Sequence, residues 1–167
     1  MTPSWLPPQI PLNGGNVRDD YEKLFEVFKR DFIDKDPPHI DGRRILYDTH
    51  INSIYSVEQY PYGFTHMVTT SGGNSNIVRT IDIERAKKLP WARAIIENYT
   101  DPEVRTFWAT RPDGTTSLYL WLYNFDYIII MREMRNNPSN IIVTAYHVHS
   151  EKRRTFQRLF ENAIRIL

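Results

Sequence analysis

The chain has 167 residues, of which 41% are hydrophobic and 13% aromatic, and this is the size and composition of a single domain with a substantial core. It contains no cysteine, which excludes a disulfide framework, a thiolate metal site and a cysteine nucleophile. Its 21 basic and 20 acidic residues leave a net charge of +1, so an anion-binding site must come from a local arrangement of charges.

Residues 1–15 predict an extended N-terminal arm, and residues 16–167 a single α+β domain. The arm is rich in proline, and its apolar residues indicate that it packs on the domain: Trp5, Leu6, Ile10 and Leu12. It lacks the basic and apolar stretches of a signal peptide, and no apolar run in the chain is long enough to cross a bilayer. We therefore expect a cytoplasmic protein without a membrane partner.

Apolar residues at helical spacing predict a helix from Asp19 to Asp36, which Pro37-Pro38 ends. Short apolar runs then predict strands over Arg44–Tyr47 and Gly63–Thr70. A second helical pattern extends from Ile81 to Tyr99 and is broken or restarted at Pro90.

In the second half of the chain, strand-like runs predict an antiparallel meander with a tight turn at Arg111-Pro112-Asp113-Gly114. A last helix, capped by Ser150, is expected to extend to Ile166. The fold class is therefore α+β: a mainly antiparallel four- to five-stranded sheet packed by N-terminal, middle and C-terminal helices. The four strands are expected over Arg105–Thr110, Ser117–Tyr123, Asp126–Glu133 and Asn140–Val148.

Aromatic residues alternate along the second of these strands, so that Tyr119, Trp121 and Tyr123 share one face and three leucines the other. Such a face can stack nucleobases, or it can be buried under a helix or under the N-terminal arm. We favour burial, because the apolar arm needs a surface to cover.

Several short motifs follow one another over roughly residues 60–160. They are Phe64-Thr65-His66, the segment from Leu89 to Asn98, the Leu-x-Leu-Trp-Leu strand at Leu118–Leu122, Asp126–Ile130, and Val143-Thr144-Ala145-Tyr146. This series resembles the barnase–EndoU–colicin–RelE-like (BECR) superfamily of phage and bacterial nucleases. Members of that superfamily cut RNA without a metal, using a few side chains on the concave face of a four-stranded sheet.

The resemblance implies a toxin-type endoribonuclease that needs no cofactor. Its partners would be RNA and an antitoxin or immunity protein. In the matched motifs, Thr144 and Tyr146 correspond to the terminal strand, and His66 stands where a catalytic histidine is expected. Arg93 and Arg132 correspond to the basic members of the site.

Metal-free cleavage by the 2′-hydroxyl needs a base, an acid and cations that stabilise the phosphorane. On a strand, residues two apart share a face, so Thr144 and Tyr146 project together, and His66 would project with Phe64 and Val68. We expect His66 and Tyr146 to carry protons, Thr144 to donate a hydrogen bond, and Arg93 or Arg132 to hold the phosphate. The alternative for His66 is a structural histidine in the sheet.

Two basic clusters are candidates for RNA binding. Arg85 and Lys88 lie on a basic helix face, and Arg153 and Arg154 open the last helix, where positive charge opposes the helix dipole. The alternative in both cases is an ordinary solvated surface.

Two other functions remain open. One is a non-catalytic RNA- or protein-binding module of phage or prophage origin on the same fold. The other is a metallohydrolase in which His147 and His149 bind zinc with His50 or His66, and we rank it below the ribonuclease.

Overall fold

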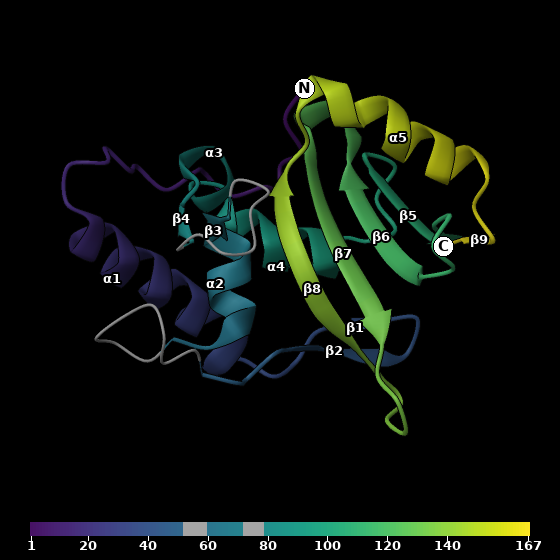
Figure 1. The fold of residues 1–167 in the computed structure, drawn as a ribbon, viewed down its shortest axis with the longest axis horizontal. Coiled ribbons are helices and arrows are strands. Elements are labelled where there is room, and N and C mark those ends of the chain that lie inside the picture. Colours follow the sequence, from purple (N-terminus) through teal and green to yellow (C-terminus); the bar gives the residue numbers. More distant parts are fainter. Residues whose placement is uncertain (52–59, 72–78) are drawn as a thin grey trace.

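A curled sheet of seven strands runs through the fold, with helices on both of its faces (Figure 1). The computed structural model describes residues 1–51, 60–71 and 79–167. Strand order in the sheet is β1-β2-β8-β7-β6-β5-β9, and a separate two-stranded pair is formed by β3 (Thr69–Thr70) and β4 (Thr80–Ile81). The α+β class is confirmed.

The predicted meander forms the centre of the sheet. Its strands are β5 (Val104–Thr110), β6 (Thr116–Leu122), β7 (Tyr127–Glu133) and β8 (Ser139–His147), each antiparallel to the next. Gly114 has a φ of 85° in the turn between β5 and β6, a conformation that glycine adopts without steric cost. A 3-10 turn at Tyr123–Phe125 connects β6 to β7.

The sheet is larger than predicted, because short strands extend it at both edges. β2 (Arg43–Tyr47) pairs parallel to β8, β1 (His39–Ile40) pairs with β2, and β9 (Arg165–Ile166) pairs with β5. The expected four to five strands were therefore too few, since two-residue strands are too short to show a period in the sequence.

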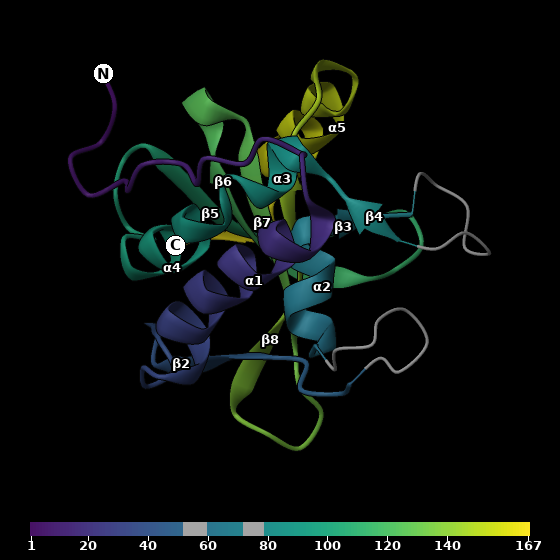
Figure 2. The ribbon, with the colours of Figure 1, turned by 90° about the vertical axis from the view of Figure 1, so that its left-hand side faces the viewer.

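Four helices and a π-helical turn cover one face of the sheet (Figure 2). Asn16 caps the first helix, because its side chain accepts hydrogen bonds from the backbone of Arg18 and Asp19. Together with the sheet, these helices enclose the main core, which includes Phe28, Phe64 and Leu120. The elements are α1 (Val17–Phe28), η1 (Lys29–Ile33), α2 (Tyr62–Val68), α3 (Ile83–Ala86) and α4 (Leu89–Glu97).

The last helix, α5 (Ser150–Glu161), packs on the opposite face, which we call the α5 face, and no other helix of the described ranges lies there (Figure 1). Tyr119 and Trp121 are buried there against Phe156. The aromatic face of β6 is thus buried as expected, but α5 rather than the N-terminal arm covers it. Ser150 is the first helical residue and not the cap, and the helix ends at Glu161 rather than at Ile166, because the chain then turns back into β9.

The predicted strand over Gly63–Thr70 was wrong, since most of this segment is helix α2. Phe64, Met67 and Val68 are all fully buried, and their i, i+3, i+4 spacing fits one face of a helix. Over so few residues, the pair Phe64 and Val68 fits a period of two as well as it fits a helical turn. His66 therefore lies on a helix and not on a sheet.

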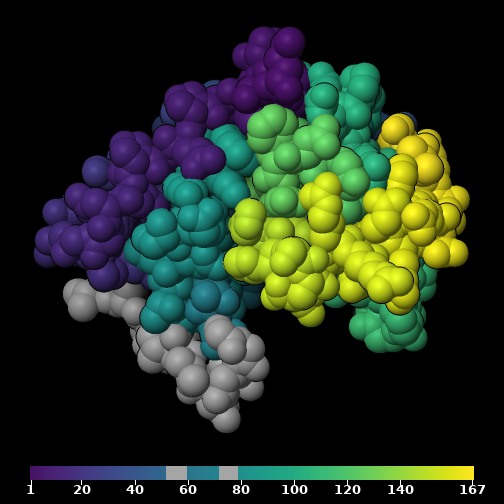
Figure 3. Space-filling model, turned by 90° about the horizontal axis from the view of Figure 1, so that it is seen from above, coloured from purple at the N-terminus to yellow at the C-terminus, as the bar shows by residue number. Residues whose placement is uncertain are grey.

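The N-terminal arm packs on the helical layer and on the sheet (Figure 3). The indole of Trp5 donates to a carboxylate oxygen of Asp101 at 2.8 Å, and the indole of Trp91 donates to the carbonyl of Pro7 at 2.9 Å. No helix in the described ranges is both long and apolar enough to cross a membrane.

Candidate functional site

A β-bulge in β8 sets up the candidate site. Thr144 pairs with Ile130 and Ile142 pairs with Met131, so Val143 is an extra residue without an opposite partner. The bulge turns Thr144 and Tyr146 toward the α5 face, while Ile142 stays in the main core. β2 pairs with β8 only as far as Ile142, which leaves the edge of β8 beyond the bulge facing α2.

A cavity of about 250 Å³ opens at this edge. His66 and Tyr62 of α2 line it together with Arg132 of β7. A Cβ on Gly63 would lie 2.8 Å from the Cβ of Tyr47, so glycine is needed there to let α2 approach β2 this closely. The other residues that line the cavity are Asp48, Gly63, Ile141, Ile142 and Val143.

His66 is suited to accept a proton. Its ring lies 5.6 Å from that of Tyr62, centroid to centroid, in an edge-on contact. Burial lowers the pKa of His66 below its ordinary value, and the guanidinium groups of Arg79 and Arg85 lower it further, while Asp48 partly opposes them. The imidazole is therefore neutral at pH 7.

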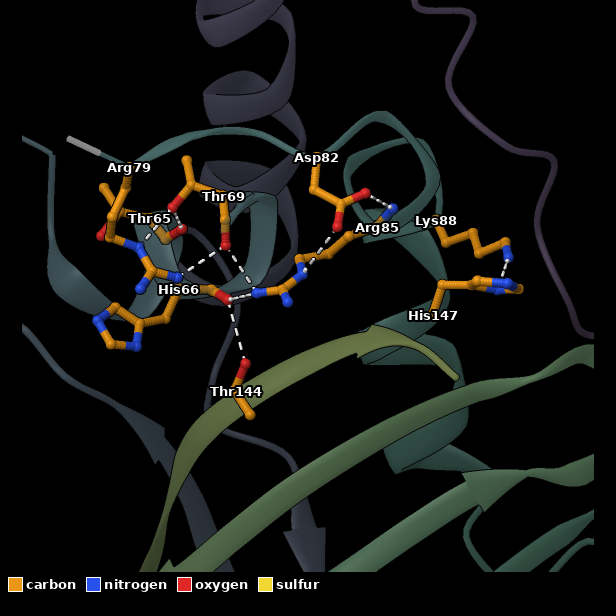
Figure 4. A network of polar contacts seen from close by, with 9 residues as sticks. All are labelled: Thr65, His66, Thr69, Arg79, Asp82, Arg85, Lys88, Thr144 and His147. Atoms are coloured by element: carbon orange, nitrogen blue, oxygen red, sulfur yellow. Dashed lines mark hydrogen bonds and ion pairs between the residues drawn. The ribbon is translucent and has the colours of Figure 1, made fainter. Parts of the chain in front are cut away.

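The C-terminal end of α2 is held by two arginines (Figure 4). Arg85 donates to the carbonyls of His66 and Thr69 at 3.0 and 2.7 Å, and Arg79 donates to the same Thr69 carbonyl at 2.7 Å. Thr144 also donates to the His66 carbonyl, at 3.2 Å. Cations are favourable at a helix C-terminus, so this network fixes the backbone of His66 against β8.

Tyr146 lies two residues beyond Thr144 on the same side of β8. Its ring packs 6.3 Å from Phe156, and the guanidinium carbon of Arg85 lies 5.2 Å from its centre. Burial raises the pKa of Tyr146, although Arg111 and Arg85 oppose the shift. The hydroxyl is therefore protonated at neutral pH and can donate a hydrogen bond.

Two arginines on the α5 face form no close ion pair within the described part of the chain. Arg132 and Arg111 form no ion pair with any residue that the structure describes. Arg111 donates instead to the hydroxyl of the buried Tyr119, at 2.8 Å. Tyr62 and Asp48, which line the cavity with His66, were missed in the prediction from the sequence. Tyr62 would have been found from its i, i+4 spacing to His66 had the helix been recognised.

Arg93 lies elsewhere in the fold. Its guanidinium donates to the carbonyls of Asp31 and Asp36, both at 3.0 Å, and forms an ion pair with Glu97. These contacts tie α4 to η1, so we no longer assign Arg93 to the site.

The four residues predicted to bind RNA also differ in their surroundings. Lys88 is only 5% exposed, and its ammonium lies 2.7 Å from Nδ1 of His147 (Figure 4), so it is not on a solvated basic face. Arg85 is half-buried in the α2 network. Arg153 packs on the ring of Tyr123 and pairs with Asp126, which compensates for its position near the start of α5. Arg154 is exposed.

The zinc hypothesis gains no support from the arrangement of the histidines. Nδ1 of His147 is engaged by Lys88, and the ring of His149 lies edge-on to that of His147 at 5.0 Å. Over the residues that the structure describes, no three His, Asp or Glu side chains are grouped closely enough to hold a metal ion.

Comparisons with protein-family models, with curated proteins and with solved structures gave no match. The function is therefore inferred from the cavity at the edge of β8 and the residues that line it.

Proposed function

We propose that the chain is a metal-independent endoribonuclease whose site is the cavity at the edge of β8. The observation that carries the proposal is that His66 and Arg132, from separate elements, line one cavity in which the arginine has no acidic partner among the described residues. A neutral imidazole and a guanidinium on one cavity can supply the base and the cation that phosphodiester cleavage by a 2′-hydroxyl uses.

In the proposed reaction, His66 removes the proton of the 2′-hydroxyl as its oxygen attacks the neighbouring phosphorus. Arg132 stabilises the negative charge that builds up on the phosphorane oxygens. The bond from phosphorus to the 5′ oxygen then breaks, and that oxygen takes up a proton from Tyr146, which is protonated at neutral pH. The products are a 2′,3′-cyclic phosphate and a 5′-hydroxyl, and the proton on His66 returns to Tyr146 through solvent.

The test is to incubate the purified chain with total cellular RNA in excess EDTA and to analyse the ends of the products. We expect cleavage that leaves cyclic phosphates, and a loss of about 10²–10⁴-fold in kcat/KM for His66→Gln. His39→Gln is the matched control, since His39 is exposed on β1. Arg135→Gln serves the same purpose for Arg132→Gln.

An absence of cleavage by the wild type, with RNA binding retained, would favour the non-catalytic RNA-binding module instead. Cleavage that EDTA abolishes would argue against the metal-independent mechanism. An antitoxin or immunity protein remains part of the proposal as a partner that covers this site.

A further inference from the structure

A second cationic position lies on the α5 face. Arg111 follows β5 directly, and its backbone is held in the turn, since its amide donates to the Thr115 carbonyl at 2.9 Å and its own carbonyl accepts from Gly114 at 2.9 Å. The carboxylate of nearby Asp113 accepts from the Thr115 amide at 2.8 Å. Asp113 interacts with Arg111 electrostatically, but no carboxylate of the described residues forms a close ion pair with this guanidinium.

The side chain of Arg111 is oriented by the hydrophobic core that lies under α5. Its Nε donates to the hydroxyl of Tyr119, whose ring is stacked on Phe107 at 5.1 Å with an interplanar angle of 13°. Tyr119 is fully buried as a residue, so its hydroxyl is a fixed acceptor. The remaining guanidinium nitrogens of Arg111 are left to bind a ligand.

The same guanidinium acts on the residues of the candidate site. Arg111 and Tyr119 both interact electrostatically with the Tyr146 hydroxyl. Tyr146 and Thr144 are separated by one residue, a spacing of roughly 7 Å along a strand, and Thr144 is bonded to the carbonyl of His66. Arg132 lies on β7 and Arg111 just beyond β5, with β6 between these two strands, so both arginines project from the same face of the sheet.

We propose that Arg111, held in place by the hydroxyl of Tyr119, forms a second phosphate subsite for single-stranded RNA, next to the one at His66 and Arg132. The inference rests on the proposed function and deepens it, because it defines the shortest good ligand as an RNA with two phosphodiesters. Each unpaired guanidinium neutralises one phosphate.

Binding to uncleavable RNA tests the subsite independently of catalysis. The probes are a 2′-O-methyl dinucleotide with one phosphodiester and 2′-O-methyl trinucleotides with two, whose blocked 2′ oxygen prevents cleavage. We expect the wild type to bind a trinucleotide about tenfold more tightly than the dinucleotide, as one charge-assisted contact allows. In Arg111→Gln this ratio should fall to near one, and the salt dependence of trinucleotide binding should decrease by about 0.7 in its logarithmic slope.

Arg135→Gln carries the same change of charge on an exposed turn and should keep the wild-type ratio. Tyr119→Phe keeps the buried ring but removes the acceptor that orients Arg111, and it should give an intermediate ratio. Circular dichroism and thermal unfolding confirm that each variant is folded.

A ratio near one in the wild type, or an Arg111→Gln variant that weakens both probes equally, would overturn the subsite. If the trinucleotide preference depends on Arg111 but wild type cleaves no RNA, the subsite stands and the proposed nuclease function fails. The two inferences therefore fail separately.

Discussion

The protonation state of His66 is determined by its immediate surroundings. Burial and two guanidinium groups disfavour the imidazolium form, and the carboxylate of Asp48 is the group that favours it. The pKa of His66 in the folded protein is therefore lower than 6.5, the ordinary value. A histidine that acts as a base must be neutral, so kcat/KM should hold between pH 7 and 6.5 and fall only at lower pH.

The Asp48→Asn variant tests this electrostatic balance at the scale of one residue. Removing the carboxylate removes the attraction for the imidazolium, so the pKa of His66 should decrease further, and the acidic limb of the activity profile should move to lower pH with it. NMR titration of the His66 ring measures the pKa without reference to activity. Asp34→Asn, on an exposed carboxylate at the end of η1, should leave it unchanged; a rise in the pKa of His66 in Asp48→Asn would contradict the assignment.

At the scale of the element, α2 is stabilised from its C-terminal end by Arg85. The side chain of Arg85 is 13% exposed, and its two carbonyl acceptors belong to the last turn of the helix and the residue after it. In Arg85→Met we expect the free energy of unfolding to fall by about 1–3 kcal/mol, because these buried carbonyls lose a charged donor. Urea unfolding measures the change, and Lys87→Met, at a partly exposed position in an i, i+3 ion pair, should cost less than about 1 kcal/mol. Equal losses in both variants would show that Arg85 does not stabilise α2.

The same helix shows where prediction from the sequence reached its limit. The long alternating runs of β5 to β8 were predicted within one or two residues, because each run is long enough to show its period and each turn has its own glycine, proline or asparagine. Seven residues of α2 fit either period, and only packing of Phe64, Met67 and Val68 in the main core decides the outcome. The same holds for the candidate site. Thr144 and Tyr146 were placed correctly on one face of β8, because the strand is long enough to show its period. The neighbours of His66 could not be predicted, because they depend on how α2 packs against the sheet.

At the scale of the molecule, the candidate site lies where the two cores meet. The sheet separates the main core from the core under α5. The pairing of β2 with β8 ends at the bulge, so the edge of β8 beyond it is not paired with β2. His66 reaches this edge from the helical layer, and Arg132 lines the same cavity from β7. In the proposed reaction, residues from opposite sides of the sheet would act on one phosphodiester.

The N-terminal arm belongs to the main core and lies away from this edge. Its apolar residues Trp5, Leu6, Ile10 and Leu12 are half-buried against that core, and the amide of Ile10 donates to the carbonyl of Lys87 at 2.7 Å. Deleting residues 1–12 should lower the free energy of unfolding by about 2–4 kcal/mol, because it exposes Trp91 and the apolar surface beneath the arm. The pKa of His66 should not change, since none of the groups that shift it belongs to the arm. Deleting only the exposed residues 1–2 is the control, and a full deletion as stable as the wild type in urea would show that the arm contributes nothing to the main core.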